Sequence, residues 1–298
     1  MKKITFLYLL LISLVGAPMV KAQVAIKTTN DSVKFGNTLS PGIWVNVPES
    51  ELENVRKDWI KVLEKGTKSK AIVNGNEVTI FGAQFKDLSE EPVNVYSKLE
   101  TKDSTVMLFT SVELRRDEFT KANTKEHNQL IESVKGFAKE QYLEVAGDQL
   151  SKQESKLKDF EKNLASARKD KEKLEKSLQS ANTTISEEEY KIVTTQKEME
   201  VTDGSLDALG TRLSTTTDKD AKKSLESEIK DLQKKKKSNL KDISSSENKI
   251  SKAKEQISDN KSAIETNLLQ QEEMQVLISA QTRQVANYTT KVSTIKSY

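Results

Sequence analysis

The sequence predicts a small α+β head, an antiparallel sheet with two helices, followed by a long antiparallel α-helical coiled-coil hairpin. Two observations lead to this fold class. Residues 24–120 contain short β-rich runs separated by turn residues, whereas the chain beyond residue 143 has an apolar residue at nearly every seventh position. With 31% charged and 5% aromatic residues, the chain is too polar to form one compact globule of 298 residues.

The first residues have the pattern of a secretory signal peptide. Lys2 and Lys3 precede an apolar run at residues 4–15, and Val20-Lys21-Ala22 fits a cleavage site before Gln23. We therefore expect residues 1–22 to be removed and the mature protein to be periplasmic or secreted; an uncleaved anchor is the alternative. The chain contains no cysteine, which excludes disulfides and a lipid-modified cysteine. No later segment is apolar for long enough to cross a membrane.

The head is expected to span residues 23–140. A strand at Gly42–Pro48 leads to a helix that we expect to begin at Ser50, with Glu53 in capping-box position. Its apolar residues recur at helical spacing, as a core-facing stripe does: Leu52, Val55, Trp59, Val62 and Leu63.

Two hairpins and a second helix complete the predicted head. Residues 71–81 form a hairpin with its turn at Asn74-Gly75, and residues 93–100 and 105–114 form another. A helix is expected to begin near Asn123, and its apolar face is broad enough to cover a sheet: Leu130, Ile131, Val134, Phe137 and Ala138.

Residues 141–298 are expected to form the hairpin, with arms at about 143–213 and 221–296. Counted in sevens, nine of ten positions in the first arm and eight of ten in the second are apolar, which is typical of a coiled coil. We call these apolar positions the seam: Leu150, Leu157, Leu164, Leu178, Ile185, Ile192, Met199, Leu206, Leu213, Ile229, Ile243, Ile250, Ile257, Ile264, Ile278, Val285 and Val292.

The turn of the hairpin is expected at about residues 214–220. Leu213 and Ile229 are two heptads plus two residues apart, a phase change that neither a stutter nor a stammer produces. Ser and Thr in this stretch favour backbone-bonded turns over helix interior. The two seams have equal length, which predicts that Leu150 faces Val292 and Leu178 faces Ile264. A continuous rod with a local irregularity is the alternative.

Polar residues occupy many companion positions, three residues after each seam position: Glu188, Thr195, Thr202, Asn239, Ser246, Asn260 and Asn267. Two interpretations stay open. Buried polar residues fix the register and partner number of a coiled coil at a cost in stability, or these positions stay partly hydrated in a loose hairpin.

Charge and residue types bear on the class of function. The chain has 48 Lys+Arg and 45 Asp+Glu, and residues 1–22 contain three lysines and no acid, so the mature chain is balanced. A chain with equal numbers of acidic and basic residues has no net positive charge to attract nucleic acid. The sequence contains one histidine, no cysteine and no glycine-rich phosphate loop, so it predicts no metal site, cofactor or catalytic group. We expect no enzymatic activity.

A few single residues are weaker candidates for chemistry. His127 could serve as a general base but is expected to lie solvated near a helix start, and Glu90-Glu91 is expected to be a loop. The aromatic side chains that could line a pocket are Trp44, Trp59 and Phe81. Two short matches to an O-glycosylation pattern occur at Asp31-Ser32-Val33 and Asp103-Ser104-Thr105.

The order of segments resembles a known family. A leader ending in "KAQ", then "GIWVNVPESELENVRKDWIKVLEKG", then "EEPVNVYSKLE" and a Lys/Glu-rich tail is similar to a family of uncharacterised exported proteins from Gram-negative bacteria, with a small α/β head and a coiled-coil tail. The resemblance implies export and a two-part architecture, and it implies no substrate. Periplasmic holdase chaperones with helical tentacles are similar in architecture only, because their hairpin grows out of an oligomerising β-body.

These expectations favour an exported, non-enzymatic cell-envelope protein. The coiled coil would act as a spacer, a scaffold or an oligomerisation arm, and the head would bind a protein partner. A periplasmic holdase-type chaperone is the first alternative, and an enzyme in the head is the second.

Overall fold

The computed structural model describes residues 24–86, 88–103 and 105–298, so the predicted signal peptide lies outside the described residues. The chain forms two compact units. One contains the residues up to Lys158 together with Ser279–Tyr298, and the other contains Asp159–Ile278. The elements are β1 Thr28–Phe35, β2 Thr38–Val47, α2 Leu52–Glu64, β3 Ile72–Asn74, β4 Glu77–Ala83, β5 Val93–Lys102, β6 Thr105–Arg115, β7 Glu118–Phe119, α3 Lys125–Thr215 and α4 Lys219–Lys296.

The strands form one antiparallel sheet in the order β1-β2-β6-β5-β4-β3, with β7 paired to β6. Strand β1 was not expected from the sequence. It pairs with β2 over its whole length, from Thr28 opposite Val45 to Phe35 opposite Thr38. Most of its side chains are exposed, so its sequence lacks the alternation of apolar and polar residues that marks a half-buried strand.

The two predicted hairpins are present. In the β3–β4 hairpin Asn74 pairs with Glu77, so the turn residues are Gly75 and Asn76 and not Asn74-Gly75. Gly75 has a φ of 58°, which glycine adopts without steric cost. The β5–β6 hairpin closes at the pair Lys102 and Thr105, in the predicted place.

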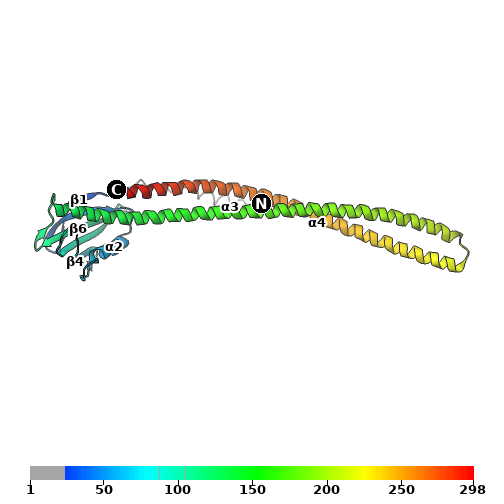
Figure 1. Ribbon diagram of the computed structural model, residues 1–298, viewed down its shortest axis with the longest axis horizontal. Helices are drawn as coiled ribbons and strands as arrows, with labels where there is room; N and C mark the ends of the chain where they lie inside the picture. The colour runs from blue at the N-terminus through cyan, green and yellow to red at the C-terminus, as the bar shows by residue number, and fades with distance from the viewer. Residues whose placement is uncertain (1–23, 87, 104) are drawn as a thin grey trace. The chain divides into compact units, whose positions relative to one another are not determined.

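The head core lies between one face of the sheet, α2 and the first turns of α3 (Figure 1), which confirms the predicted α+β head with two helices. Trp59 of α2 is fully buried and donates its indole N–H to Ser97 Oγ at 2.9 Å. Its ring lies 4.9 Å from that of Phe137. The partnered N–H lets this large side chain fill the core without an unsatisfied polar group.

The first helix of the head lacks the expected cap, whereas the second begins close to the expected residue. Helix α2 is preceded by Glu51, which makes no side-chain cap bond, and the Ser50 hydroxyl donates to Pro48 O instead, so the predicted capping box is wrong. At α3, Thr124 Oγ1 accepts the backbone N–H of His127. Thr124 therefore caps the helix, and Asn123 precedes it with a φ of 67°.

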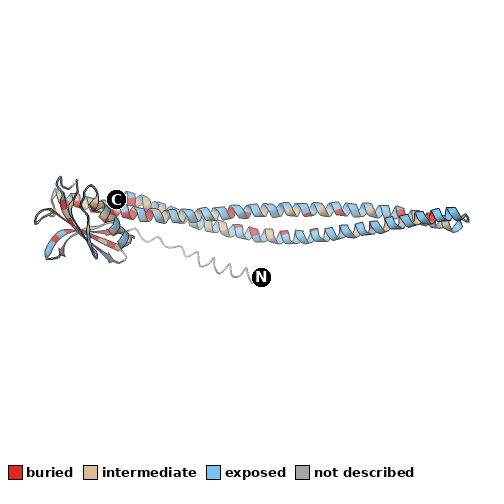
Figure 2. Ribbon diagram, turned by 90° about the horizontal axis from the view of Figure 1, so that it is seen from below, coloured by how far each residue is buried: buried red, intermediate tan, exposed pale blue. Residues whose placement is uncertain are grey.

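The helices α3 and α4 confirm the antiparallel hairpin. Helix α3 ends at Thr215 and α4 begins at Lys219, where the Asp218 carboxylate accepts the backbone N–H of Ala221 at 2.7 Å. The break lies inside the expected stretch, and α3 and α4 run side by side within each unit (Figure 1). Figure 2 shows buried residues gathered in the sheet and recurring at intervals along both helices.

The register of the hairpin corrects the expected pairing by one heptad. In the second unit, Ser246 donates to Glu188 and Asn267 donates to the carbonyl oxygen of Ala167. This register aligns Leu178 with Ile257, whereas the sequence predicted Ile264. The expected pairing was drawn from the equal lengths of the two seams, whereas the chain folds about residues 216–218, inside the expected turn, and this fold pairs the seams one repeat earlier.

Candidate functional site

Six aromatic side chains form a connected group in the head, which we call the aromatic face: Phe35, Trp44, Phe81, Tyr96, Phe109 and Phe119. In β5 the buried residues Val93, Val95 and Ser97 point to the core, so Tyr96 points to the opposite side of the sheet. Tyr96 lies at the centre of the group, with ring centroids 5.7 Å from Phe35, 6.2 Å from Phe81 and 6.2 Å from Phe119.

The strand register places the remaining rings beside this centre. Trp44 of β2 is directly opposite Phe109 of β6, and their ring centroids are 5.3 Å apart. Phe109 is fully buried although it lies on the side away from the helices. Gly42 makes this possible, because a Cβ atom there would lie 2.6 Å from Phe109 Cζ and 2.4 Å from Thr110 O.

A buried carboxylate anchors the aromatic face. Glu113 accepts hydrogen bonds from Asn94 Nδ2 at 2.9 Å, from the Tyr96 hydroxyl at 3.0 Å and from the backbone N–H of Asp117 at 2.8 Å. Burial alone would raise the pKa of Glu113, but these three donors lower it below its usual value. Burial, and then the bond to Glu113, raise the pKa of Tyr96 to about 12. The pair therefore fixes the orientation of the central ring.

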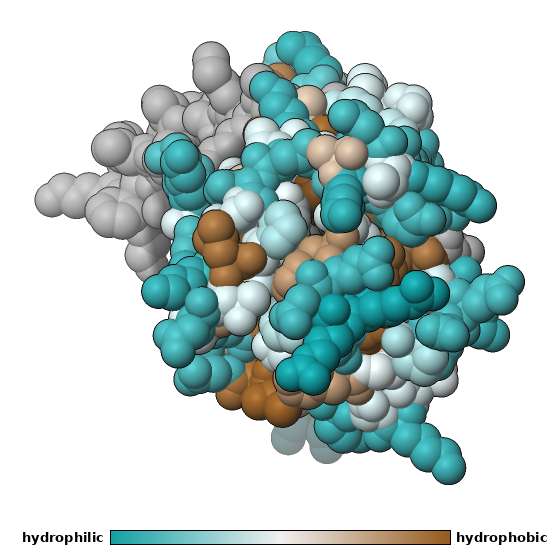
Figure 3. Space-filling view, turned by 90° about the vertical axis from the view of Figure 1, so that its left-hand side faces the viewer, coloured by the Kyte–Doolittle hydropathy of each residue, from teal (hydrophilic) through white to brown (hydrophobic). Residues whose placement is uncertain are grey.

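The aromatic face is a candidate binding surface. Phe81 is 51% exposed, whereas Phe35 is 9% exposed, so the group presents rings to solvent on a packed support. The Trp44 indole is held by Asp31, which accepts its N–H at 3.1 Å. Rigid rings with polar groups beside them are typical of recognition surfaces. In the view of Figure 3, hydrophobic residues gather in patches between polar ones.

The structure separates the three aromatic residues that the sequence suggested for one pocket. Trp44 and Phe81 belong to the aromatic face, but Trp59 lies in the core on the other side of the sheet. The alternation of Tyr96 with Val95 and Ser97 was the sequence signal that could have identified the aromatic face, because it assigns Tyr96 to the side away from the core.

His127 is not solvated, contrary to the expectation. It is 5% exposed, and its Nε2 lies 3.0 Å from Asn30 Oδ1. An amide oxygen only accepts, so Nε2 carries the proton in this arrangement. Burial lowers the pKa of His127 below its usual value, which favours the neutral ring at pH 7. The expected solvated position was wrong because β1, which supplies Asn30, was not anticipated.

The two O-glycosylation matches fall in different surroundings. Ser32 lies in the exposed part of β1, and its backbone N–H donates to the Asp31 carboxylate at 2.8 Å. Ser104 lies outside the described residues.

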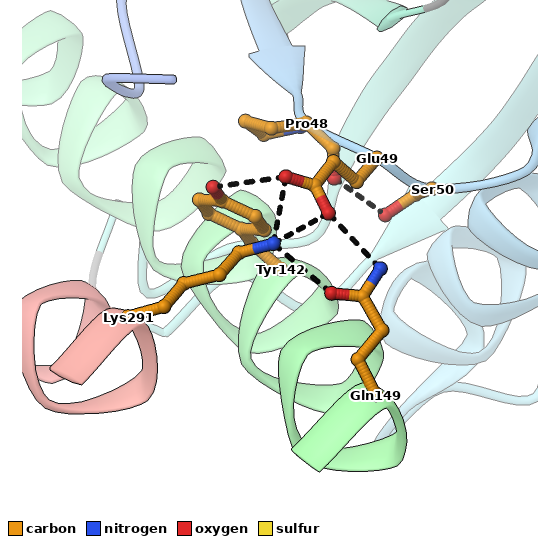
Figure 4. A network of polar contacts seen from close by, with 6 residues as sticks. All are labelled: Pro48, Glu49, Ser50, Tyr142, Gln149 and Lys291. Atoms are coloured by element: carbon orange, nitrogen blue, oxygen red, sulfur yellow. Dashed lines mark hydrogen bonds and ion pairs between the residues drawn. The ribbon is translucent and has the colours of Figure 1, made fainter. Parts of the chain in front are cut away.

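A second polar cluster joins α3, α4 and the loop before α2, and we call it the clasp (Figure 4). Lys291 donates to both carboxylate oxygens of Glu49, at 2.7 and 2.6 Å, and to Gln149 Oε1 at 3.0 Å. Gln149 Nε2 donates back to Glu49 at 3.1 Å, and the Tyr142 hydroxyl donates to it at 3.4 Å. Burial, and then the charge of Glu49, raise the pKa of Tyr142 to about 12. The clasp ties three separate segments of one unit together.

Most seam residues are half-buried, and Leu164 is buried. The companion positions are the more deeply buried ones, polar residues included. Glu188 is 5% exposed, Thr202 3%, Ser246 6% and Asn267 9%. Thr195 is only half-buried. These values favour the interpretation that buried polar residues fix the register.

Glu188 is the most connected of these polar residues. Its carboxylate accepts from Ser246 Oγ at 2.7 Å and from Lys249 Nζ at 3.1 Å across the hairpin, and from Lys191 Nζ at 2.7 Å on its own helix. These bonds, that of Lys191 first, lower the pKa of Glu188 to about 2. An acceptor that meets its donors in one register only disfavours slippage of α4 along α3.

None of the helices in the described ranges is long and apolar enough to span a membrane. Within those ranges, no three His, Cys, Asp or Glu side chains come together as a metal site.

No protein-family model and no curated protein sequence matches the chain. Among solved structures, the chain is similar to a coiled-coil segment (residues 345-468 and 694-814) of Pyrococcus yayanosii Smc, with 16% sequence identity and a TM-score of 0.47. The match covers 56% of this chain and 69% of that segment. The structure itself shows an α/β head and a long helical hairpin.

Proposed function

We propose that this protein is an exported, non-enzymatic cell-envelope protein, in which the head binds a protein partner and the hairpin serves as a spacer or scaffold. The leader sequence and the resemblance to exported Gram-negative proteins support export. The buried polar layers of the hairpin support the scaffold role, because they specify one pairing of α3 with α4. The seam is thus used within one chain, and self-association would have to use the outer faces of the helices.

The aromatic face is the observation that carries the binding role of the head. Tyr96 is held by Glu113 and Trp44 by Asp31, while Phe81 is left half-exposed. Burying an exposed aromatic ring against a partner contributes favourable free energy at a small cost in side-chain entropy. The head would therefore contact its partner through Phe81 and the rings beside it.

Crosslinking in intact cells tests the proposal. The full chain and its Phe81→Ser variant would be crosslinked, and adducts would be compared by mass. Leu39→Ser is the matched control, because Leu39 is also exposed, at 65%. Thr38 pairs with Phe35 and so lies on the side of the aromatic face, whereas the next residue, Leu39, points to the other side of the sheet. We expect Phe81→Ser to lose an adduct that Leu39→Ser retains. Equal adducts in both variants would contradict a partner site on the aromatic face.

Export is tested by fractionation. The protein should be found in the periplasmic or secreted fraction, with Gln23 as its first residue on N-terminal sequencing. A membrane-bound form that retains Met1 would contradict this part of the proposal.

A holdase-type chaperone remains the second candidate, and exposed apolar residues in the second unit favour it. Tyr190 is 74% exposed, Val201 72% and Val276 63%. Such residues could hold unfolded clients. A spacer should not suppress aggregation of a refolding client at equimolar amounts. Suppression that is lost in a Tyr190→Ser, Val201→Ser variant would favour the chaperone.

A further inference from the structure

The single histidine of the chain meets the edge strand β1 on the side of the sheet opposite the aromatic face. His127 is the third residue of α3 and is 5% exposed. Its Nε2 lies 3.0 Å from Oδ1 of Asn30, a residue of β1. A buried ring on α3 therefore contacts an edge strand whose own side chains are mostly exposed.

The surroundings of His127 suit a neutral ring and disfavour a cation. The Nε2–H group donates to Asn30, whereas Nδ1 is enclosed and has no hydrogen-bond partner among the described residues. A protonated ring would carry a second N–H group at Nδ1, and that group would find no acceptor there. The ring also lies in the first turn of α3, where the partial positive charge of a helix N-terminus disfavours a cation.

The charged groups on the elements around His127 do not offset a positive ring. No ion pair of the described residues includes His127. On β1, Asp31 lies on the other side of the sheet, and Lys34 is an exposed cation. The described strands β2 and β6 carry no charged residue on the helix side of the sheet. The charged residues of β7, of the segment before α3 and of its first turn are exposed or line a cleft beside β7 that His127 does not line: Glu118, Lys121, Lys125 and Glu126.

Strand β1 connects His127 to the aromatic face across the sheet. Asn30 and Asp31 are consecutive in β1, so their side chains point to opposite sides. Asp31 accepts the indole N–H of Trp44 at 3.1 Å, and Phe35 of the same strand belongs to the aromatic face. A displacement of β1 away from α3 would therefore move groups that hold or form the aromatic face.

We propose that β1 is a pH-sensitive strand, in which protonation of His127 opens the contact with Asn30, loosens β1 and weakens binding of the partner to the aromatic face. In the open arrangement water reaches the ring, and both of its N–H groups donate to water. The last step rests on the proposed function, whereas the opening of β1 is a property of the free protein.

The direction of the pH effect follows from the two environments of the ring. Burial lowers the pKa of His127 in the closed arrangement, and exposure returns it towards its ordinary value of 6.5. The open arrangement therefore binds more protons than the closed one. The closed arrangement is fully stable above pH 6.5 and loses stability as pH falls below that value. Because the chain has one histidine and no cysteine, this is the one side chain whose ordinary pKa lies in this interval.

Two measurements on the full mature chain test the opening of β1. Nuclear magnetic resonance of the single imidazole follows its protonation, and we expect a pKa below 6.5. Hydrogen exchange followed by mass spectrometry reports on the amides that β1 bonds to β2. After correction for the intrinsic rates, these amides should exchange at least about threefold faster at about pH 5.5 than at about pH 7.5.

Two variants assign the effect to the histidine. His127→Gln keeps an N–H donor for Asn30 but cannot titrate, so its β1 should exchange equally at both pH values. Glu126→Gln is the matched control, because it removes the adjacent titratable group and should keep the pH dependence of the wild type. A measured pKa of 6.5 or above, or wild-type exchange that does not change with pH, would overturn the inference. The same pH dependence in His127→Gln would also overturn it, and the wild-type measurements decide the matter even if that variant does not fold.

Crosslinking at the same two pH values tests the coupling to the aromatic face. The adduct that is lost in Phe81→Ser should weaken at the lower pH in the wild type and persist in His127→Gln. An adduct of equal strength at both pH values, with β1 open at the lower one, would contradict the coupling. Absence of a Phe81-dependent adduct at either pH would contradict the proposed function, whereas the exchange measurements decide the opening of β1 in both cases.

Discussion

The Lys291 ammonium, near the end of the chain, donates to both carboxylate oxygens of Glu49, a residue 242 positions earlier. The Lys291 side chain is 5% exposed and that of Glu49 is 17% exposed. Glu49 also has a φ of 56°, a conformation that is uncommon for residues other than glycine. A buried pair between such distant segments means that the base of the hairpin is part of the folded head.

Breaking the clasp should destabilise the protein. Lys291→Met leaves the Glu49 carboxylate buried without its cation, which costs about 3–5 kcal/mol. Urea unfolding followed by tryptophan fluorescence measures this, because Trp59 is in the head core. Lys296→Met, in the exposed last turn of α4, is the control and should stay within about 0.5 kcal/mol of the wild type. Equal midpoints for the two variants would show that the clasp contributes nothing.

Replacing Gly42 and Gly136 by alanine should change the stability of the protein in opposite directions. Gly42→Ala would place a Cβ atom 2.4 Å from Thr110 O, and the overpacking should cost about 1–3 kcal/mol. Gly136 lies in α3 with no atom within 4 Å of the added Cβ, so Gly136→Ala should stabilise by about 0.5–1 kcal/mol. Thermal unfolding measures both variants. A stabilising Gly42→Ala would contradict the close approach of Phe109 to β2.

The hairpin should lose stability in acid through Glu188. Its pKa is lowered from 4.5 to about 2, so its contribution is complete above pH 4.5 and is lost as pH falls towards 2. Urea midpoints from far-ultraviolet circular dichroism, measured across this interval, should fall less steeply for Glu188→Gln than for the wild type. Glu189→Gln, on the adjacent exposed position, should keep the wild-type slope. Identical slopes for all three proteins would exclude this role of Glu188.

Local periodicity explains which parts of the fold could be predicted. The stripe of α2 and the seam depend on residues close in sequence, and so do the two hairpins. Strand β1 escaped prediction because most of its side chains are exposed, and among the described strands it pairs with β2 at the edge of the sheet. The burial of His127 was missed for the same reason, since Asn30 in β1 is its partner.

The candidate sites were less accessible to sequence reasoning. The aromatic face follows from strand alternation once all strands are known, but the missing β1 removed Phe35 from the pattern. The clasp joins Glu49 to Lys291 through the tertiary fold, and nothing local marks either residue. The predicted pairing of α3 with α4 was one heptad away from the observed one, because a heptad repeat alone does not distinguish one repeat from its neighbour.

Crosslinking across the hairpin tests the central claim, that α3 and α4 of one chain pair with each other in a fixed register. Ala181 and Ala253 are 3% and 5% exposed, and the Glu188–Ser246 register places them opposite each other. Cysteines at both positions, in a chain without other cysteines, should form a disulfide within one polypeptide at low protein concentration.

The control pairs Ala181→Cys with Asn260→Cys, one heptad further along α4 and roughly 10 Å away along the helix axis, and it should oxidise slowly. We expect a faster-migrating monomer on non-reducing gels for the Ala181→Cys, Ala253→Cys protein alone. Crosslinked dimers in its place, or faster oxidation of the control, would contradict the intramolecular hairpin or its register.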